Sequence, residues 1–225
     1  MRMTRLQCVQ SCLALYQQYG EDFLLNIVTE DETPQSLYVP DSRRDSMAWK
    51  RPEEKPLLKI RSGTSHKREL MLTVFWSASG VLLVDYLEKG RTINSVYYCN
   101  LLQQVVNLQQ PAQSRSGLNR RRVWFLHDNA PIHTSHMTNA SLNTLPLTLL
   151  PHPPYSPDLA PSDFRLFRHL KKVIRGERFP DADSLKMFVN DWIAGRPPTF
   201  FRQAFLDLHH RWMKTVEAGS SYIEK

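Results

Sequence analysis

The chain has 225 residues, 41% of them hydrophobic, so it is long enough to bury one well-formed core. Its formal net charge of +7 favours an acidic partner, and nucleic acid is the commonest such partner. No apolar run is long enough to cross a bilayer, and the three cysteines have no disulfide-framework spacing. These features argue against a membrane-spanning protein and against a disulfide-rich secreted domain, and we expect a soluble intracellular protein.

The first part of the chain predicts a helix, two strands and a basic loop. Residues 5–20 have apolar residues at helical spacing and end at a glycine. The β-rich run "DFLLNIVTED" (22–31) predicts a strand ending near Thr29–Asp31, and "SLYV" (36–39) predicts a second strand. Residues 41–70 contain nine Lys or Arg against five Asp or Glu, and we expect a long basic loop or arm there.

The middle of the chain predicts alternating strands and helices. Two β-rich runs within residues 70–90 flank Ser79-Gly80, as in a hairpin. A helix follows, with Thr92 or Asn94 as its N-cap. The next predicted elements are a short strand in "VWFLHD" (123–128), a helix in "HTSHMTNASLNTL" (133–145) and a strand in "LTLLP" (147–151).

The last third is predominantly helical, with candidate helices in residues 163–177, 181–195 and 200–219. This order of elements predicts an α/β fold in which helices pack on a mixed sheet. Asp31 and Asp128 come at the ends of predicted strands, and Asp163 opens a predicted helix. Three carboxylates brought together repel one another unless cations such as Mg²⁺ lie between them, so the sequence indicates a metal site.

Two blocks, "LHDNAPIHT" (126–134) and "HPPYSPDLAPSDF" (152–164), closely resemble signature blocks of mariner-family transposases of the Tc1/mariner superfamily. In that family 34 residues separate the second and third catalytic aspartates, and residues 129–162, between Asp128 and Asp163, number 34. "IVTEDET" (27–33) is similar to the block of the first aspartate, which corresponds to Asp31.

The resemblance implies an RNase H-like catalytic domain in residues 23–225. It implies that Asp31, Asp128 and Asp163 bind two Mg²⁺ or Mn²⁺ ions. It also implies that the domain cuts DNA at transposon ends and joins these ends to TA target sites. Residues 1–22 are then an N-terminal helix, or a linker to a missing DNA-binding region. Because the family's paired helix-turn-helix modules have no counterpart here, we expect specific end recognition to be impaired. A homodimer, in which the basic arm reaches the partner, and a nuclear location are the corresponding expectations.

The chain departs from the family pattern beside the first aspartate. Glu30 stands where the family usually has glycine, and Pro34 where it usually has tryptophan. An added carboxylate beside Asp31 disfavours the charged form of its neighbour, and the lost tryptophan removes a packing anchor. A second interpretation therefore stays open, in which the protein is an inactive transposon remnant that binds DNA or a protein partner. An RNase H-like enzyme acting on RNA–DNA hybrids is a third.

Five prolines lie between Leu149 and Phe164. Proline presets its own φ and restricts the residue before it, so this bridge is expected to hold Asp163 at a fixed distance from the strand-borne acids.

Several polar residues near the acids have two interpretations each. His127 and Asn129 are candidates to support a metal ligand, or are hydrogen-bonded core groups. Asp158 is expected to stabilise a turn. His133 and His136 lie near His127, but no cysteine pair accompanies them, and we do not expect a zinc motif.

Basic residues recur along one face of the helix after Asp163, opposite an apolar face of Leu166, Phe167, Leu170 and Val173. This face is either solvated or holds DNA phosphates, and the same choice applies to the connector before residue 123. The candidate DNA-backbone contacts are Arg120, Arg121, Arg122, Arg165, Arg168, Lys171, Lys172 and Arg175.

Overall fold

A five-stranded mixed sheet with helices on both faces forms the centre of the computed structural model, which describes residues 4–38, 69–87, 90–114 and 122–223. The strand order is β3-β2-β1-β4-β5, with β1, β4 and β5 parallel and the β1–β2 and β2–β3 pairs antiparallel. The strands are β1 (Ile27–Ser36), β2 (Glu69–Ser77), β3 (Gly80–Tyr86), β4 (Val123–Leu126) and β5 (Leu147–Leu149).

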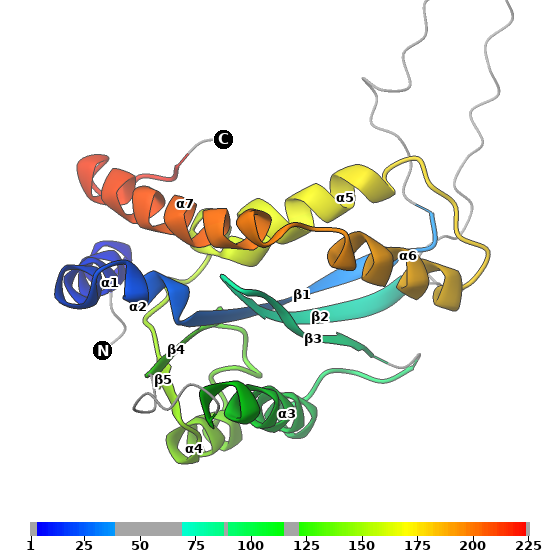
Figure 1. Ribbon diagram of the computed structural model, residues 1–225, viewed down its shortest axis with the longest axis horizontal. Coiled ribbons are helices and arrows are strands. Elements are labelled where there is room, and N and C mark those ends of the chain that lie inside the picture. Colours follow the sequence, from blue (N-terminus) through cyan, green and yellow to red (C-terminus); the bar gives the residue numbers. More distant parts are fainter. Residues whose placement is uncertain (1–3, 39–68, 88–89, 115–121, 224–225) are drawn as a thin grey trace, which may run out of the picture.

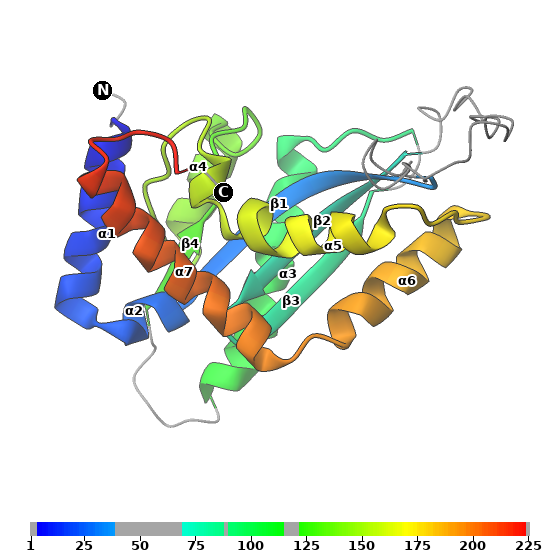
Figure 2. The ribbon, with the colours of Figure 1, turned by 90° about the horizontal axis from the view of Figure 1, so that it is seen from above.

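The helices divide between the two faces of the sheet (Figure 1). On one face lie α5 (Arg168–Ile174), α6 (Ala182–Ala194) and α7 (Pro198–Glu217), with α1 (Arg5–Tyr19) and α2 (Glu21–Leu25) at one end. On the other lie α3 (Ser95–Ser114) and α4 (His136–Thr144). Figure 2 shows α1 alongside α7, and Tyr16 stacks on His209 at 3.8 Å between ring centroids. Residues 5–19 are therefore part of the same folded unit as the sheet.

Alternation along the strands produces two hydrophobic cores. In β2, Leu72, Val74 and Trp76 pack into the core beneath α5, α6 and α7, whereas Phe75 packs into the core beneath α3. The same alternation in β1 sends Ile27 to the first core and Val28 to the second.

The first predicted strand is corrected at both ends. Residues 21–25 form α2, and β1 then continues to Ser36, so Asp31 lies within the strand opposite Val74 instead of at its end. Pro34 is tolerated because β1 pairs with β4 only over Ile27–Thr29, which leaves that edge without a β4 partner at Pro34. The predicted strand at 36–39 is wrong, since Tyr38 forms only an isolated bridge with Arg178 and residue 39 lies outside the described part.

Other elements confirm the expectations from the sequence. The hairpin forms around Ser79-Gly80, and Asn94 caps α3 by accepting a hydrogen bond from the Tyr97 amide at 2.9 Å. Within the expected basic loop, residues 41–68 lie outside the described part, while Glu69 and Leu70 already belong to β2. None of the described helices has the length and apolarity needed to span a membrane.

The helix after the proline-rich bridge starts with a π-helical turn, η3 (Ser162–Phe167), that leads into α5. Leu166, Phe167 and Leu170 are buried as predicted. Val173 is 43% exposed and Ile174 takes the inward position, which corrects the predicted apolar face. A short 3₁₀ turn, η2 (Pro157–Leu159), precedes η3.

Candidate active site

Asp31 lies on the face of β1 that is covered by η3 and α5. It has the same strand parity as Ile27, which packs into the core on that face. Its Oδ1 accepts a hydrogen bond from the Glu32 amide at 2.9 Å. Because β1 is paired with β2 at this position, the Asp31 backbone is held rigidly by the sheet.

Asp128 follows β4 by two residues, beside β1. Thr29 and Leu126 are partners in the parallel β1–β4 pair, so continuing two residues along each chain leads to Asp31 and Asp128. The Asp128 side chain is 51% exposed. Its Oδ1 accepts a hydrogen bond from the Ala130 amide at 2.8 Å and lies 2.6 Å from His133 Nδ1.

Asp163 is an exposed residue in η3, the π-helical turn. Its neighbour Ser162 is fully buried and accepts a hydrogen bond from Trp76 Nε1 at 3.0 Å, which fastens the turn to β2. Trp76 in turn packs against Phe205 of α7, with ring centroids 5.1 Å apart. π-helical turns are uncommon and occur often at functional sites.

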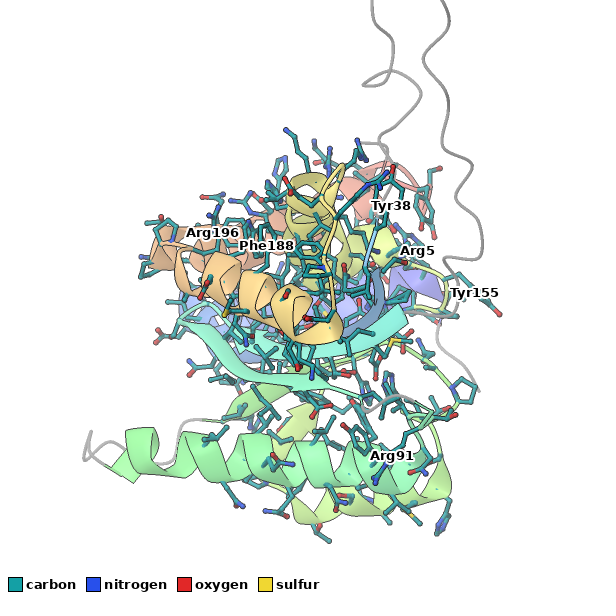
Figure 3. The ribbon with its side chains drawn as sticks, turned by 90° about the vertical axis from the view of Figure 1, so that its right-hand side faces the viewer. Arg5, Tyr38, Arg91, Tyr155, Phe188 and Arg196 are labelled. Carbon is teal, nitrogen blue, oxygen red and sulfur yellow. The ribbon has the colours of Figure 1, made fainter. Side chains whose placement is uncertain are left out.

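The proline-rich bridge before Asp163 is anchored at Asp158. Arg5 of α1 donates two hydrogen bonds to the Asp158 carboxylate, at 3.0 and 2.5 Å, and the Ile223 amide donates a third at 3.0 Å. Asp158 thus lies in the turn η2, but its carboxylate joins this turn to both ends of the described chain instead of capping it. Tyr155 is 96% exposed at φ 52° and points outward in Figure 3.

The bridge is also tied to the loop after β4. Asn129 Nδ2 donates a hydrogen bond to the His152 carbonyl oxygen at 2.8 Å. The Asn129 side chain therefore connects the segment that carries Asp128 to the segment that leads to Asp163.

The three aspartates interact electrostatically. Burial raises the pKa of Asp31 well above its usual range, and the carboxylates of Asp163, Glu32 and Asp128 raise it further. Partial desolvation by neighbouring groups, together with the nearby Asp128, also raises the pKa of Asp163, against the opposing effect of Lys171. For Asp128, burial is outweighed by hydrogen bonds from His133 and the Ala130 amide, which leave its pKa below the ordinary value. The three carboxylates are therefore near enough to interact, and their catalytic role stays a prediction.

A second polar cluster lies on the opposite face of β1. Glu30 is buried, and its Oε1 accepts a hydrogen bond from the Tyr98 hydroxyl at 2.9 Å. The same hydroxyl lies 2.9 Å from His127 Nδ1. His133 Nε2 lies 3.4 Å from Glu30 Oε1 and 3.3 Å from Glu32 Oε1. His127 thus points away from Asp31 and toward α3.

The charges in this second cluster compensate one another. Burial opposes protonation of His133, but Glu30, Asp128 and Glu32 together raise its pKa to about 11. Burial and the neighbouring His133 lower the pKa of His127 to about 3. Burial, followed by the charge of Glu32, raises the pKa of Glu30 well above its usual range.

Some of the candidate DNA-contacting residues already interact with other side chains of the protein, and others are exposed. Arg165 forms an ion pair with Asp207 at 3.3 Å and lies over the Phe200 ring, so it is engaged within the fold. Lys171 is exposed and close enough to Asp163 to lower its pKa. Arg168, Lys172 and Arg175 are exposed, Arg122 lies over the Trp124 ring, and Arg120 and Arg121 fall outside the described residues.

Sequence reasoning missed the supporting residues Tyr98, Glu32, Trp76 and Ser162. Alternation in "TEDE" (29–32) was a usable signal, because it places Glu30 and Glu32 on the face opposite Asp31. The contacts of Tyr98 and Trp76 depend on the packing of α3 and η3, which no local pattern reports.

Comparison with known proteins gives concordant matches. Residues 39–131 match the family model "Transposase (partial DDE domain)". The Mariner Mos1 transposase of Drosophila mauritiana is 34% identical over 218 residues, which are 95% of this chain and 61% of that protein. The human histone-lysine N-methyltransferase SETMAR is 34% identical over 222 residues, 96% of this chain and 31% of that protein. The chain thus spans about three fifths of the length of the Mos1 transposase and less than a third of the length of SETMAR.

Solved structures agree with the fold. The Mos1 transposase catalytic domain with Raltegravir and Mn superposes with a TM-score of 0.79 and 30% identity, over 98% of this chain and 94% of that chain. A Mos1 paired-end complex with the left transposon end gives a TM-score of 0.84 and 33% identity, over 98% of this chain and 62% of that chain. With this coverage of a solved catalytic domain, the chain belongs to the mariner family of transposases and has their RNase H-like catalytic fold.

Proposed function

We propose that this chain is the catalytic domain of a DNA transposase that cuts and joins phosphodiester bonds with two divalent metal ions. The observation that carries the proposal is that β1 and β4 pair in parallel just ahead of Asp31 and Asp128, while η3, which carries Asp163, packs on β1. Carboxylates held this close repel one another. Mutual repulsion of this kind favours bound cations.

The donor set fits Mg²⁺ or Mn²⁺. All three side chains offer carboxylate oxygens, which hard divalent cations prefer. Solved Mos1 structures are described with Mn and with Mg, which supports the same ion class here. When bound, a pair of such ions activates a water or hydroxyl group on one side of a phosphodiester and stabilises the leaving oxygen on the other.

The chain's own contribution is to fix the three acids. Sheet pairing holds Asp31, and hydrogen bonds from His133 and Ala130 orient Asp128. The Trp76–Ser162 bond and the Asp158 anchor position the turn that carries Asp163. Lys171, beside Asp163, is suited to hold a DNA phosphate near the acids.

DNA is the proposed partner, because relatives are described in complexes with transposon ends and in a strand transfer complex. A TA target site, a homodimer and a nuclear location complete the proposal, and the family resemblance in the sequence supports them. The competing function is DNA or protein binding without catalysis, which the departures from the family sequence at Glu30 and Pro34 favour, although Glu30 lies on the face of β1 opposite Asp31.

The test is nicking of labelled duplex DNA with Mn²⁺ or Mg²⁺. Asp128→Ala is expected to lower the nicking rate by more than about a hundredfold, because removing a ligand removes the ion that does the chemistry. Asp183→Ala, at an exposed acid of α6, is the matched control and should cut like the wild type. Equal rates for the wild type and Asp128→Ala, in protein that still binds duplex DNA, would favour binding without catalysis. Faster cutting of an RNA–DNA hybrid would favour the hybrid nuclease.

A further inference from the structure

The polar cluster on the α3 face of β1 contains three buried side chains with metal-binding atoms. One ligand atom each from Glu30, His127 and His133 lies within 4.8 Å of the others. We propose that these three residues form a site for a transition-metal ion of the zinc class, separate from the three-aspartate centre. This proposal does not depend on the nuclease activity proposed above.

The distance between the ligand atoms of His133 and Glu30 suits a tetrahedral ion. His133 Nε2 lies 3.4 Å from Glu30 Oε1 and 3.3 Å from Glu32 Oε1, longer than a good hydrogen bond. With bonds of about 2.0–2.1 Å, adjacent ligands of a tetrahedral zinc ion lie roughly 3.3–3.4 Å apart. His127 supplies the third ligand atom, within 4.8 Å of the other two, and closes on the ion when it binds; a water molecule would complete the tetrahedron.

The surrounding residues hold both imidazoles as metal-binding proteins do. Asp128 Oδ1 lies 2.6 Å from His133 Nδ1, so a proton on that nitrogen is held by the carboxylate and Nε2 is directed at Glu30 and Glu32. The Tyr98 hydroxyl, 2.9 Å from His127 Nδ1, fixes the orientation of the second ring. A carboxylate–histidine–metal arrangement therefore links this site to Asp128.

Glu30 provides an independent sign of a ligand. Its side chain is fully buried, and among the described residues its Oε2 is one of the few buried polar atoms without a hydrogen-bond partner. A buried carboxylate oxygen without a partner is costly, and a cation bound by both oxygens of Glu30 would satisfy it. In the metal-free chain the same position is taken by the proton on His133 Nε2, held between Glu30 and Glu32, and this proton is released to solvent when the ion binds.

Two of the three proposed ligands, His127 and His133, line a cavity, and the set of ligand atoms has a chemical preference among ions. His127, Asp128, His133 and His152 line a cavity of about 240 Å³, which is roomy enough for an ion with its waters. Two imidazoles favour Zn²⁺ or Co²⁺, whereas the all-carboxylate set on the other face favours Mg²⁺. The two sites should therefore be filled by different ions.

The spacing of His127, His133 and His136 in the sequence did not predict this site, and only the first two of these histidines belong to it. His136 is exposed, whereas His127 and His133 stack with ring centroids 5.0 Å apart. The third ligand, Glu30, comes from a strand far away in the sequence, where the family usually has glycine.

The experiment is a Co²⁺ and Zn²⁺ titration of the full chain in a large excess of Mg²⁺, which keeps the three-aspartate centre occupied. We expect one tightly bound ion per chain. The visible absorption of bound Co²⁺ should be that of a four-coordinate ion, and X-ray absorption should give metal–ligand distances typical of nitrogen and oxygen ligands. Glu30→Gln should weaken this binding by at least about tenfold. Asp163→Asn and the exposed Glu217→Gln should leave it unchanged.

A folding control keeps the result decisive. If Glu30→Gln lowers stability, His133→Asn is titrated as a second variant, and Zn²⁺ should raise the thermal midpoint of the wild type but of neither variant. Binding that is equal in the wild type and Glu30→Gln, or that is lost in Asp163→Asn, would overturn the proposal. Loss of DNA nicking in the wild type would contradict the proposed function while leaving the zinc-class site standing.

Discussion

Acidic side chains gather beside both faces of β1, but their charges are balanced differently on the two faces. On the η3 face, Asp31 lies near Asp163 and Asp128, and the three raise one another's pKa values except at Asp128. On the α3 face, Glu30 and Glu32 flank His133, whose positive charge offsets theirs. A repelling acid cluster therefore lies on one side of β1 and a compensated cluster on the other, and Asp128, which follows β4, contacts members of both.

The largest effect should come from breaking the Arg5–Asp158 ion pair, which anchors the proline-rich bridge before Asp163. Arg5→Ala removes the partner of Asp158 in a pair whose side chains are 13% and 5% exposed. We expect the free energy of unfolding to fall by about 3 kcal/mol, because the buried Asp158 carboxylate loses its counter-charge. Chemical denaturation measures this, and nicking by the folded protein should fall as well.

The control for Arg5→Ala is Arg202→Ala, which breaks an exposed ion pair with Glu21. Exposed pairs contribute little, so its unfolding free energy should change by less than about 1 kcal/mol. Similar losses in both variants would mean that the Asp158 anchor is no stronger than a surface contact.

The opposite face is tested by Tyr98→Phe. This change leaves Glu30 Oε1 and His127 Nδ1 without the hydroxyl between them. Unfolding free energy should fall by about 2 kcal/mol, since buried polar groups lose their partner. Nicking by the folded variant should stay within about twofold of the wild type, if the two faces act independently.

Tyr19→Phe is the matched control for Tyr98→Phe, since Tyr19 is 43% exposed and its ring can still pack beside Trp124. It should match the wild type in stability. A large loss of nicking in Tyr98→Phe would show that the α3 face controls the acids on the η3 face.

Sequence patterns captured the elements whose signal is local. The glycine after Tyr19, the Asn94 cap and the turn at Ser79-Gly80 each stop or start an element by themselves, and the structure confirms them. The strand predicted at "DFLLN" is wrong because the apolar residues of this run fit a short buried helix as well as a strand. Tertiary packing decides between the two.

The three aspartates were found through the family blocks, whereas their surroundings were not. Parity along β1 was enough to separate Glu30 from Asp31 once the strand was known to continue through both. The partners of Glu30 come from α3 and from the loop before α4, so they require the tertiary fold. His133 was noted in the sequence as one of three nearby histidines, but its role depends on Glu30 and Glu32, which lie far from it in the sequence.

A smaller effect on the η3 face is expected from Ser162→Ala. The change leaves the buried Trp76 Nε1 without its acceptor and loosens the turn that carries Asp163. We expect nicking to slow by about tenfold, because small displacements of catalytic groups are costly. The Mn²⁺ concentration for half-maximal nicking should also rise, which a loss of stability alone would not produce.

Ser79→Ala, at an exposed position of the hairpin, controls for Ser162→Ala. It should leave both the rate and the Mn²⁺ requirement unchanged. An unaltered Mn²⁺ requirement in Ser162→Ala would mean that the π-helical turn holds Asp163 without help from Trp76.

The smallest effect should come from Lys171→Gln, which tests whether the η3 face also meets DNA. Lys171 is exposed and close enough to Asp163 to lower its pKa, so a phosphate bound there would lie beside the acids. We expect duplex affinity to fall by about threefold, with the slope of log affinity against log salt reduced by about one. Lys186→Gln, on α6 and paired with Asp183, should change neither quantity. If both variants weaken binding equally, the positive charge near Asp163 acts only through the net charge of the chain, and the DNA path must follow another surface.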